Sequence, residues 1–174
     1  IMMAHVKGKW SIKTEKEEYF DGEKSDIRIL VHEDRGIIMS DSEFELDDQE
    51  EFLSSSPHGH IVIGGLGLGV IVDRLLKRKE ILSIEVIEID TDVIDLMEEK
   101  FSLNKRVSII HGDVRGYDFS NLEKVPDYIY LDIWDGDAGE SYEERVGAKQ
   151  YWEQICNNVF VWALDRSSDR YNEG

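Results

Sequence analysis

A short apolar run that passes directly into closely spaced glycines constrains the fold more than any other feature of this sequence. Residues 60–63 have the character of a short apolar strand, and residues 70–77 carry apolar side chains at helical spacing. The glycines between them are Gly64, Gly65, Gly67 and Gly69. Because glycine has no Cβ and tolerates positive φ, such a turn lets the backbone approach a ligand closely. The run therefore predicts a strand–turn–helix unit with a binding site at the turn.

Strands and helices continue to alternate after this unit. The further predicted strands cover residues 82–89, 107–110 and 128–133. Asp90 has the position of a helix N-cap, and residues 151–162 carry an apolar stripe that predicts a last helix. Ser141 and Glu144, just before that stripe, have the spacing of a capping box. This order is typical of α/β proteins, and it predicts a Rossmann-like, doubly wound, mostly parallel sheet with right-handed crossovers.

The first third of the chain has a different pattern. Short strands are predicted over residues 5–12, 27–31 and 36–40. Residues 32–35 are polar and suit a hairpin loop, so a small antiparallel segment is expected there. The many acids between residues 41 and 51 indicate a solvated face and the start of a helix. We therefore divide the chain into a small N-terminal β-sheet segment, residues 1–56, and a Rossmann-like core, residues 57–174.

The charge of the chain bears on its partners. The sequence has 174 residues, with 38 acidic and 20 basic side chains, and its net charge is −18. Such a surface repels phosphate backbones and anionic lipids, so we expect neither nucleic acid nor a membrane as a partner. The single cysteine, Cys156, excludes an intramolecular disulfide and a cysteine-based metal site, and no metal site is predicted. The longest apolar run, residues 61–72, is too short to span a membrane, which favours a soluble, cytoplasmic protein.

The glycine spacing excludes two common nucleotide-binding motifs. A dinucleotide fingerprint needs glycines at positions i, i+2 and i+5, but valines, Val70 and Val72, occupy the third place in the two available registers. A phosphate-binding P-loop needs a Gly-Lys-Ser/Thr ending, and none follows here. NAD and ATP are therefore disfavoured as ligands.

Acidic residues lie at the carboxyl end of each later strand of the predicted sheet. They are Glu88, Asp113, Asp132 and Asp135. In doubly wound sheets the carboxyl ends of the strands form the ligand site. A carboxylate at Glu88 can accept hydrogen bonds from ribose hydroxyls, and one at Asp113 can accept from an adenine amine. An acidic pocket suits a nucleoside with a positive centre, such as the sulfonium of S-adenosylmethionine.

The segment from Ile61 to Trp134 resembles the class I S-adenosylmethionine-dependent methyltransferase superfamily, and within it the spermidine synthase-like branch. The resemblance rests on the motifs IVIGGLGLG, VIEIDTDVIDLMEEKF, HGD and YLDIWD, in family order. It implies that Glu88 holds the ribose, Asp113 the adenine, and the glycine backbone the methionine portion. It also implies that Asp132 and Asp135 are the two acids of a catalytic D-x-x-D motif. The implied cofactor-binding residues are Gly64, Gly65, Gly67, Gly69, Glu88, Asp113 and Asp132.

Three functions are compatible with these residues. The leading prediction is a methyltransferase acting on a small, neutral or cationic acceptor, such as an amine. The second is an aminopropyltransferase that uses decarboxylated S-adenosylmethionine, although Glu45 and Ser54 stand where that branch usually has Gln and Tyr. The third is a non-catalytic, shortened relative that acts as a binding or interaction module.

The C-terminal part of the chain departs from the family pattern. The resemblance implies a sheet of seven strands, and the fifth to seventh are expected to be missing here. The fourth strand, residues 128–133, would then be an exposed sheet edge, which needs a cover. We therefore predict a homo-oligomer that covers this edge.

Overall fold

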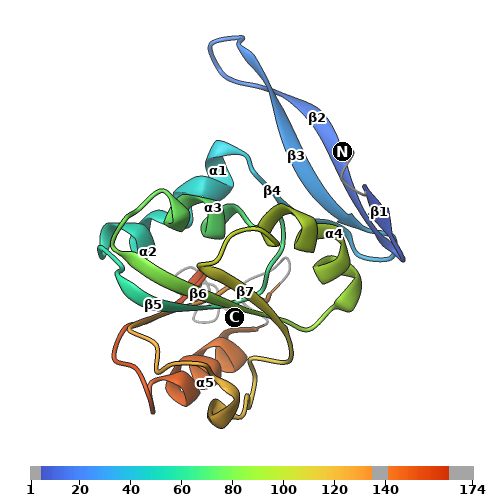
Figure 1. Cartoon of the computed structure of the whole chain (residues 1–174). Helices are drawn as coiled ribbons and strands as arrows, with labels where there is room; N and C mark the ends of the chain where they lie inside the picture. Colours follow the sequence, from blue (N-terminus) through green and yellow to red (C-terminus); the bar gives the residue numbers. More distant parts are fainter. Residues whose placement is uncertain (1–4, 135–140, 165–174) are drawn as a thin grey trace.

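The computed structural model describes residues 5–134 and 141–164, and its strands form two sheets (Figure 1). The first sheet is antiparallel and pairs its strands in chain order, which confirms the predicted N-terminal sheet. Its strands are β1 (Val6–Lys7), β2 (Trp10–Glu18), β3 (Lys24–His32) and β4 (Gly36–Ser40). β2 and β3 extend beyond their neighbours as a hairpin that projects from the rest of the molecule (Figure 1).

Two short helices lead from the first sheet to the second. They are α1 (Glu43–Asp47) and α2 (Glu50–Ser54). The side chain of Ser42 caps α1 by accepting a hydrogen bond from the Glu45 backbone N–H. The acidic segment therefore begins helices, as predicted. Phe52 and Leu53 of α2 are buried and anchor this segment in the core.

The second sheet is parallel, with the strand order β7-β6-β5-β8-β9, and confirms the Rossmann-like prediction. Its strands are β5 (Gly59–Gly64), β6 (Ile81–Glu88), β7 (Val107–His111), β8 (Tyr128–Leu131) and β9 (Val159–Val161). The connecting helices are α3 (Val70–Leu76), α4 (Thr91–Phe101) and α5 (Tyr142–Trp152), with a 3-10 turn, η1, at Phe119–Asn121. Asp90 caps α4, as predicted, by accepting from the Asp92 backbone N–H at 2.9 Å.

Alternating side chains divide the core between the two faces of the parallel sheet. Ile61 and Ile63 of β5 belong to the cluster with α3 and α4, whereas Val62 belongs to the cluster with α5. Figure 1 shows α5 on the face opposite α3 and α4. The first cluster also includes Trp10 and Phe52, so it is continuous with the N-terminal sheet and α2. The N-terminal sheet packs against this cluster, and its strand β4 lies beside the turn that follows β5, where Met39 contacts Leu68.

The end of the described chain corrects the predicted last helix and sheet edge. α5 ends at Trp152, and residues 159–161 form β9, which pairs in parallel with β8. These three residues, Val-Phe-Val, favour extended structure, because β-branched and aromatic side chains fit a half-buried strand. β8 is therefore an inner strand between β5 and β9, and a fifth parallel strand, which the sequence predicts to be missing, is present. The reason given above for an oligomer at the β8 edge is thus wrong.

The predicted capping box is also wrong. Ser141 occupies the N-cap position of α5, but its side chain makes no capping hydrogen bond. Its hydroxyl accepts instead from Nε of Arg145 at 2.8 Å. The hydroxyl oxygen that would have capped the helix is therefore hydrogen-bonded to the buried guanidinium of Arg145 instead. Among the described residues, no helix has the length and apolarity needed to cross a membrane.

Candidate functional site

A cavity lies at the carboxyl ends of the parallel strands. Its volume is about 180 Å³, and its walls come from the loops after β5, β6, β7 and β8 and from the N-terminal sheet. The predicted site residues that line it together are Gly65, Gly67, Glu88, Asp113 and Asp132. Gly64 ends β5 and Gly69 is the N-cap residue of α3, and neither is among the residues that line the cavity. Asp135 lies outside the described residues.

The glycine turn between β5 and α3 is set by close contacts with the protein itself. A Cβ on Gly65, at φ +93°, would lie 2.1 Å from the backbone oxygen of Asp132. A Cβ on Gly67, at φ +49°, would lie 2.2 Å from the sulfur of Met39. Both positions need glycine for space as well as for backbone conformation. The turn therefore packs closely against the residue after β8 on one side and against β4 on the other.

Glu88 ends β6 and faces the cavity while being 8% exposed. Its Oε2 accepts from the Leu66 backbone N–H at 2.7 Å, and its Oε1 accepts from the Asp90 N–H at 3.0 Å. Burial raises the pKa of this carboxyl, and the backbone hydrogen bonds only partly oppose that effect. A carboxylate has about four lone-pair sites, so each oxygen retains capacity for a ligand hydroxyl. Glu88 is thus held rigidly with acceptors still available.

Asp113 follows β7 and is already engaged by Arg115. Nε of Arg115 donates to Oδ1 of Asp113 at 3.0 Å, and Nη2 donates to Oδ2 at 3.1 Å. Partial burial acts to raise the pKa of Asp113, but the hydrogen bonds and charge of Arg115 outweigh it and lower the pKa. Arg115 also donates to Glu144 of α5 at 3.1 Å. Asp113 therefore stays ionised as an acceptor, with a guanidinium fixing its orientation.

Asp132 and Trp134 form the wall after β8. The Asp132 backbone N–H donates to the Gly64 oxygen at 2.8 Å, which continues the β5–β8 pairing to the cavity. The indole of Trp134 lines the cavity, and its buried Nε1 has no hydrogen-bond partner among the described residues. Behind it, the fully buried guanidinium of Arg145 lies 5.0 Å from the Trp134 ring centre and 5.2 Å from that of Trp162. This stack fixes an aromatic wall beside Asp132.

The N-terminal sheet supplies a wall that sequence reasoning missed. Trp10, Arg35 and Met39 line the cavity opposite the parallel strands. Nε1 of Trp10 donates to Oδ2 of Asp90 at 2.8 Å, and the Arg35 guanidinium lies 4.9 Å from the Trp10 ring centre. No local motif marks these positions, because their partners are distant in sequence. Within the described chain, no cluster of three or more His, Cys, Asp or Glu residues is arranged to hold a metal ion.

Comparison with known proteins connects the chain to methyltransferases. It is 32% identical over 103 residues to a probable ribosomal RNA small subunit methyltransferase A of Methanococcoides burtonii, covering 59% of this chain and 36% of that protein. It is 33% identical over 60 residues to ribosomal RNA small subunit methyltransferase A of Prochlorococcus marinus, covering 34% and 22% of the two chains. The chain thus spans about a third or less of the length of these curated relatives. No family model matches the chain.

Among solved structures, spermidine synthase from Thermotoga maritima superimposes with a TM-score of 0.48 at 18% identity, covering 90% of this chain and 63% of that one. The sequence relatives are methyltransferases, consistent with the class I superfamily to which the motifs were compared, and the strand order is that of a Rossmann-like fold.

The same relatives correct the predicted partners. The sequence predicts a small-molecule acceptor and no nucleic-acid partner, whereas both curated relatives are named as ribosomal RNA methyltransferases. Net charge reports the average surface, whereas recognition depends on the few groups around the site. The prediction that nucleic acid is excluded as a partner is therefore wrong.

Proposed function

We propose that the chain is the S-adenosylmethionine-binding core of a methyltransferase. The observation that carries this proposal is the convergence of the glycine turn, Glu88, Asp113 and Asp132 on one cavity at the carboxyl ends of β5 to β8. Glu88 fits a ribose, because its two oxygens are fixed by backbone donors and can still accept from hydroxyls. Asp113 fits an amine donor, because Arg115 keeps it ionised.

When bound, S-adenosylmethionine supplies a methyl group on a positively charged sulfur. In our proposal Glu88 and Asp113 fix the nucleoside end, and the backbone of the glycine turn meets the methionine end. Asp132 places its charge at the cavity wall beside the turn, where it favours a cationic centre and orients an approaching acceptor. Orientation of this kind can lower the activation free energy of a displacement at carbon by about 7–11 kcal/mol.

For the acceptor we propose an RNA base. The support is that both relatives are named as ribosomal RNA methyltransferases and that an aromatic side chain, Trp134, lines the cavity beside Asp132. Flat aromatic side chains stack on unpaired bases. Arg35 and Arg115 are the cationic side chains that line the cavity, and in our proposal Arg35 contacts a phosphate while Arg115 keeps its hydrogen bonds to Asp113 and Glu144.

A transfer assay tests both parts of the proposal. The protein is incubated with methyl-labelled S-adenosylmethionine and either total RNA or putrescine, and the label in each acceptor is measured. We expect label in RNA. Glu88→Ala and Asp113→Ala should each lower the transfer activity about 10- to 100-fold, which corresponds to the free energy of one hydrogen bond to a charged group. Glu98→Ala, an exposed site on α4, is the matched control and should keep full activity. Label in putrescine alone would contradict the RNA acceptor, and label in neither acceptor would contradict the whole proposal.

A further inference from the structure

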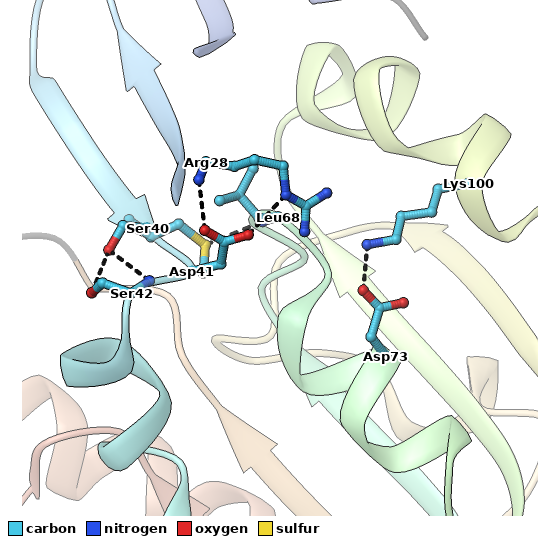
Figure 2. Close-up of polar contacts among 8 residues, drawn as sticks. Arg28, Ser40, Asp41, Ser42, Leu68, Asp73 and Lys100 are labelled. Carbon is cyan, nitrogen blue, oxygen red and sulfur yellow. Dashed lines mark hydrogen bonds and ion pairs between the residues drawn. The ribbon is translucent and has the colours of Figure 1, made fainter. Parts of the chain in front are cut away.

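Met39 places a thioether directly on the glycine turn. The Leu68 backbone N–H donates to Sδ of Met39 at 3.1 Å, and the same sulfur fills the space where a Cβ of Gly67 would lie. Met39 belongs to β4 of the N-terminal sheet, whereas Leu68 lies between β5 and α3. Figure 2 shows Leu68 of the turn close to Asp41, which follows the end of β4.

The backbone around Met39 is firmly anchored. Asp41 accepts from the Arg28 backbone N–H at 2.6 Å and from its Nε at 2.8 Å, and the Asp41 N–H donates to the Arg28 oxygen at 3.1 Å (Figure 2). The Ser40 hydroxyl donates to the Ser42 hydroxyl at 2.9 Å, and Ser42 caps α1. The main chain on either side of Met39 is therefore fixed, while the unbranched methionine side chain retains several rotamers.

The turn is also held from its other side. Asp73 of α3 forms an ion pair with Lys100 of α4 (Figure 2). A Cβ on Gly69 would lie only 2.6 Å from the ring of Phe101 of α4. Since both flanks of the turn are braced, the Met39 side chain is the element that can yield at this end of the cavity.

A thioether sulfur is a weak hydrogen-bond acceptor, so it holds the Leu68 N–H less strongly than an oxygen would. Met39 and Gly67 line the same cavity as Glu88, and the nucleoside end of the proposed ligand lies at Glu88 and Asp113. The methionine end would then lie against the turn, at the place the Met39 side chain fills. This step rests on the proposed function.

We propose that Met39 is a built-in occupant of the methionine end of the cofactor site, which S-adenosylmethionine displaces by a change of Met39 rotamer. Met39 thereby lowers the affinity for the complete cofactor without affecting the affinity for a nucleoside that lacks the amino-acid tail. It acts as a specificity-determining residue supplied by the N-terminal sheet.

The test compares two ligands on three variants by calorimetry. S-adenosylhomocysteine carries the amino-acid tail, and adenosine lacks it. Met39→Ala should bind S-adenosylhomocysteine about 2- to 10-fold more tightly than the wild type, the equivalent of one ordinary hydrogen bond, and should bind adenosine unchanged. Met39→Leu keeps the volume without the sulfur and should give a smaller gain. Ile37→Ala, on the same strand and exposed, is the control and should change neither affinity.

A readout without ligand accompanies the titrations. Amide hydrogen exchange at Leu68 should be faster in Met39→Leu than in the wild type, because the acceptor is gone, and thermal melts check that each variant is folded. A loss of S-adenosylhomocysteine affinity in Met39→Ala, or an equal change for both ligands, overturns the inference and leaves the proposed function standing. If neither ligand binds the wild type, the proposed function itself fails and this inference fails with it.

Discussion

The indole Nε1 of Trp10 donates a 2.8 Å hydrogen bond to Oδ2 of Asp90, across 80 residues of sequence. Asp90 uses its other oxygen to cap α4, and its own backbone N–H donates to Glu88. The N-terminal sheet is therefore connected through one carboxylate to the residue proposed to hold the ribose. This relationship makes the N-terminal sheet part of the site as well as its neighbour.

The first prediction concerns that connection. Trp10→Phe keeps an aromatic ring in the core and removes the indole donor, so we expect the free energy of unfolding to fall by about 1–3 kcal/mol. Binding of S-adenosylhomocysteine should weaken several-fold, because Asp90 and Glu88 lose a support. Tyr19→Phe is the matched control, since it removes a 2.8 Å side-chain hydrogen bond to Ser25 at the far end of the same sheet. Equal ligand affinity in the wild type and Trp10→Phe would show that the sheet does not support the site.

The second prediction separates crowding from backbone strain in the glycine turn. In Gly65→Ala the new Cβ would meet the Asp132 backbone oxygen, and we expect a loss of about 2–5 kcal/mol in the free energy of unfolding. Gly116 also has a positive φ, +67°, but no atom lies within 4 Å of its Cβ position, so Gly116→Ala should lower the free energy of unfolding by only about 1–2 kcal/mol. Chemical denaturation of both variants measures the difference. Similar losses in the two would mean that the turn relaxes and the contact with Asp132 is soft.

Much of the fold could be predicted from the sequence, because its strongest signals are local. The apolar strand before Gly64 and the cap at Asp90 are short-range patterns, and both are present in the structure. β9 was missed because three residues are too few to show a strand period, and an apolar stripe continued through them from α5. The long β2–β3 hairpin was also underestimated, since its outer half is charged and exposed and has no buried face to give a pattern.

The candidate site divides in the same way. Glu88, Asp113 and Asp132 were found because each lies at or near the carboxyl end of a predicted strand, and parallel strands bring their carboxyl ends together. Their roles remain proposals. Trp10 and Met39 could not be found, because their partners lie 80 and 29 residues away and depend on how one sheet packs on the other. Strand and helix ends can be predicted from local sequence, whereas contacts between residues that are distant in sequence cannot.

The third prediction concerns a buried hydroxyl away from the turn. Tyr130 of β8 is 2% exposed and stacks on Phe52 at 4.9 Å between ring centres, and its hydroxyl has no partner among the described residues. Burial raises the pKa of Tyr130 far above its usual range, so the hydroxyl is protonated at any working pH. An unsatisfied buried hydroxyl is costly, and Tyr130→Phe should raise the free energy of unfolding by about 1 kcal/mol.

Tyr151→Phe is the control for that experiment. Its hydroxyl donates to the Tyr117 backbone oxygen at 2.6 Å, so the same chemical change should lower the free energy of unfolding by about 1 kcal/mol. Opposite signs for the two variants are expected in urea titrations at neutral pH. A loss of stability in Tyr130→Phe would show that the hydroxyl has a partner in solution.

The fourth prediction is a pH dependence set by Glu88. Burial raises the pKa of its carboxyl, so between the ordinary glutamate pKa and the raised one the folded state binds more protons than the unfolded state. Ionisation of Glu88 therefore lowers the free energy of unfolding as the pH rises through that window. The ionised form is nevertheless the one that accepts from ribose hydroxyls with both oxygens. Stability and ligand binding thus depend on this proton in opposite directions.

Titration of adenosine affinity between pH 8 and about pH 5 measures the effect. We expect the affinity to fall as the pH is lowered, with a midpoint above the ordinary glutamate value of about 4.3. Glu88→Gln should bind more weakly at pH 8 and show a flat profile. Glu85→Gln is the control, because Glu85 is also buried on β6 with a pKa raised by burial, but it accepts from the Glu123 backbone N–H instead of facing the cavity. A pH profile that persists in Glu88→Gln would assign the proton to another group and remove Glu88 from the ribose site.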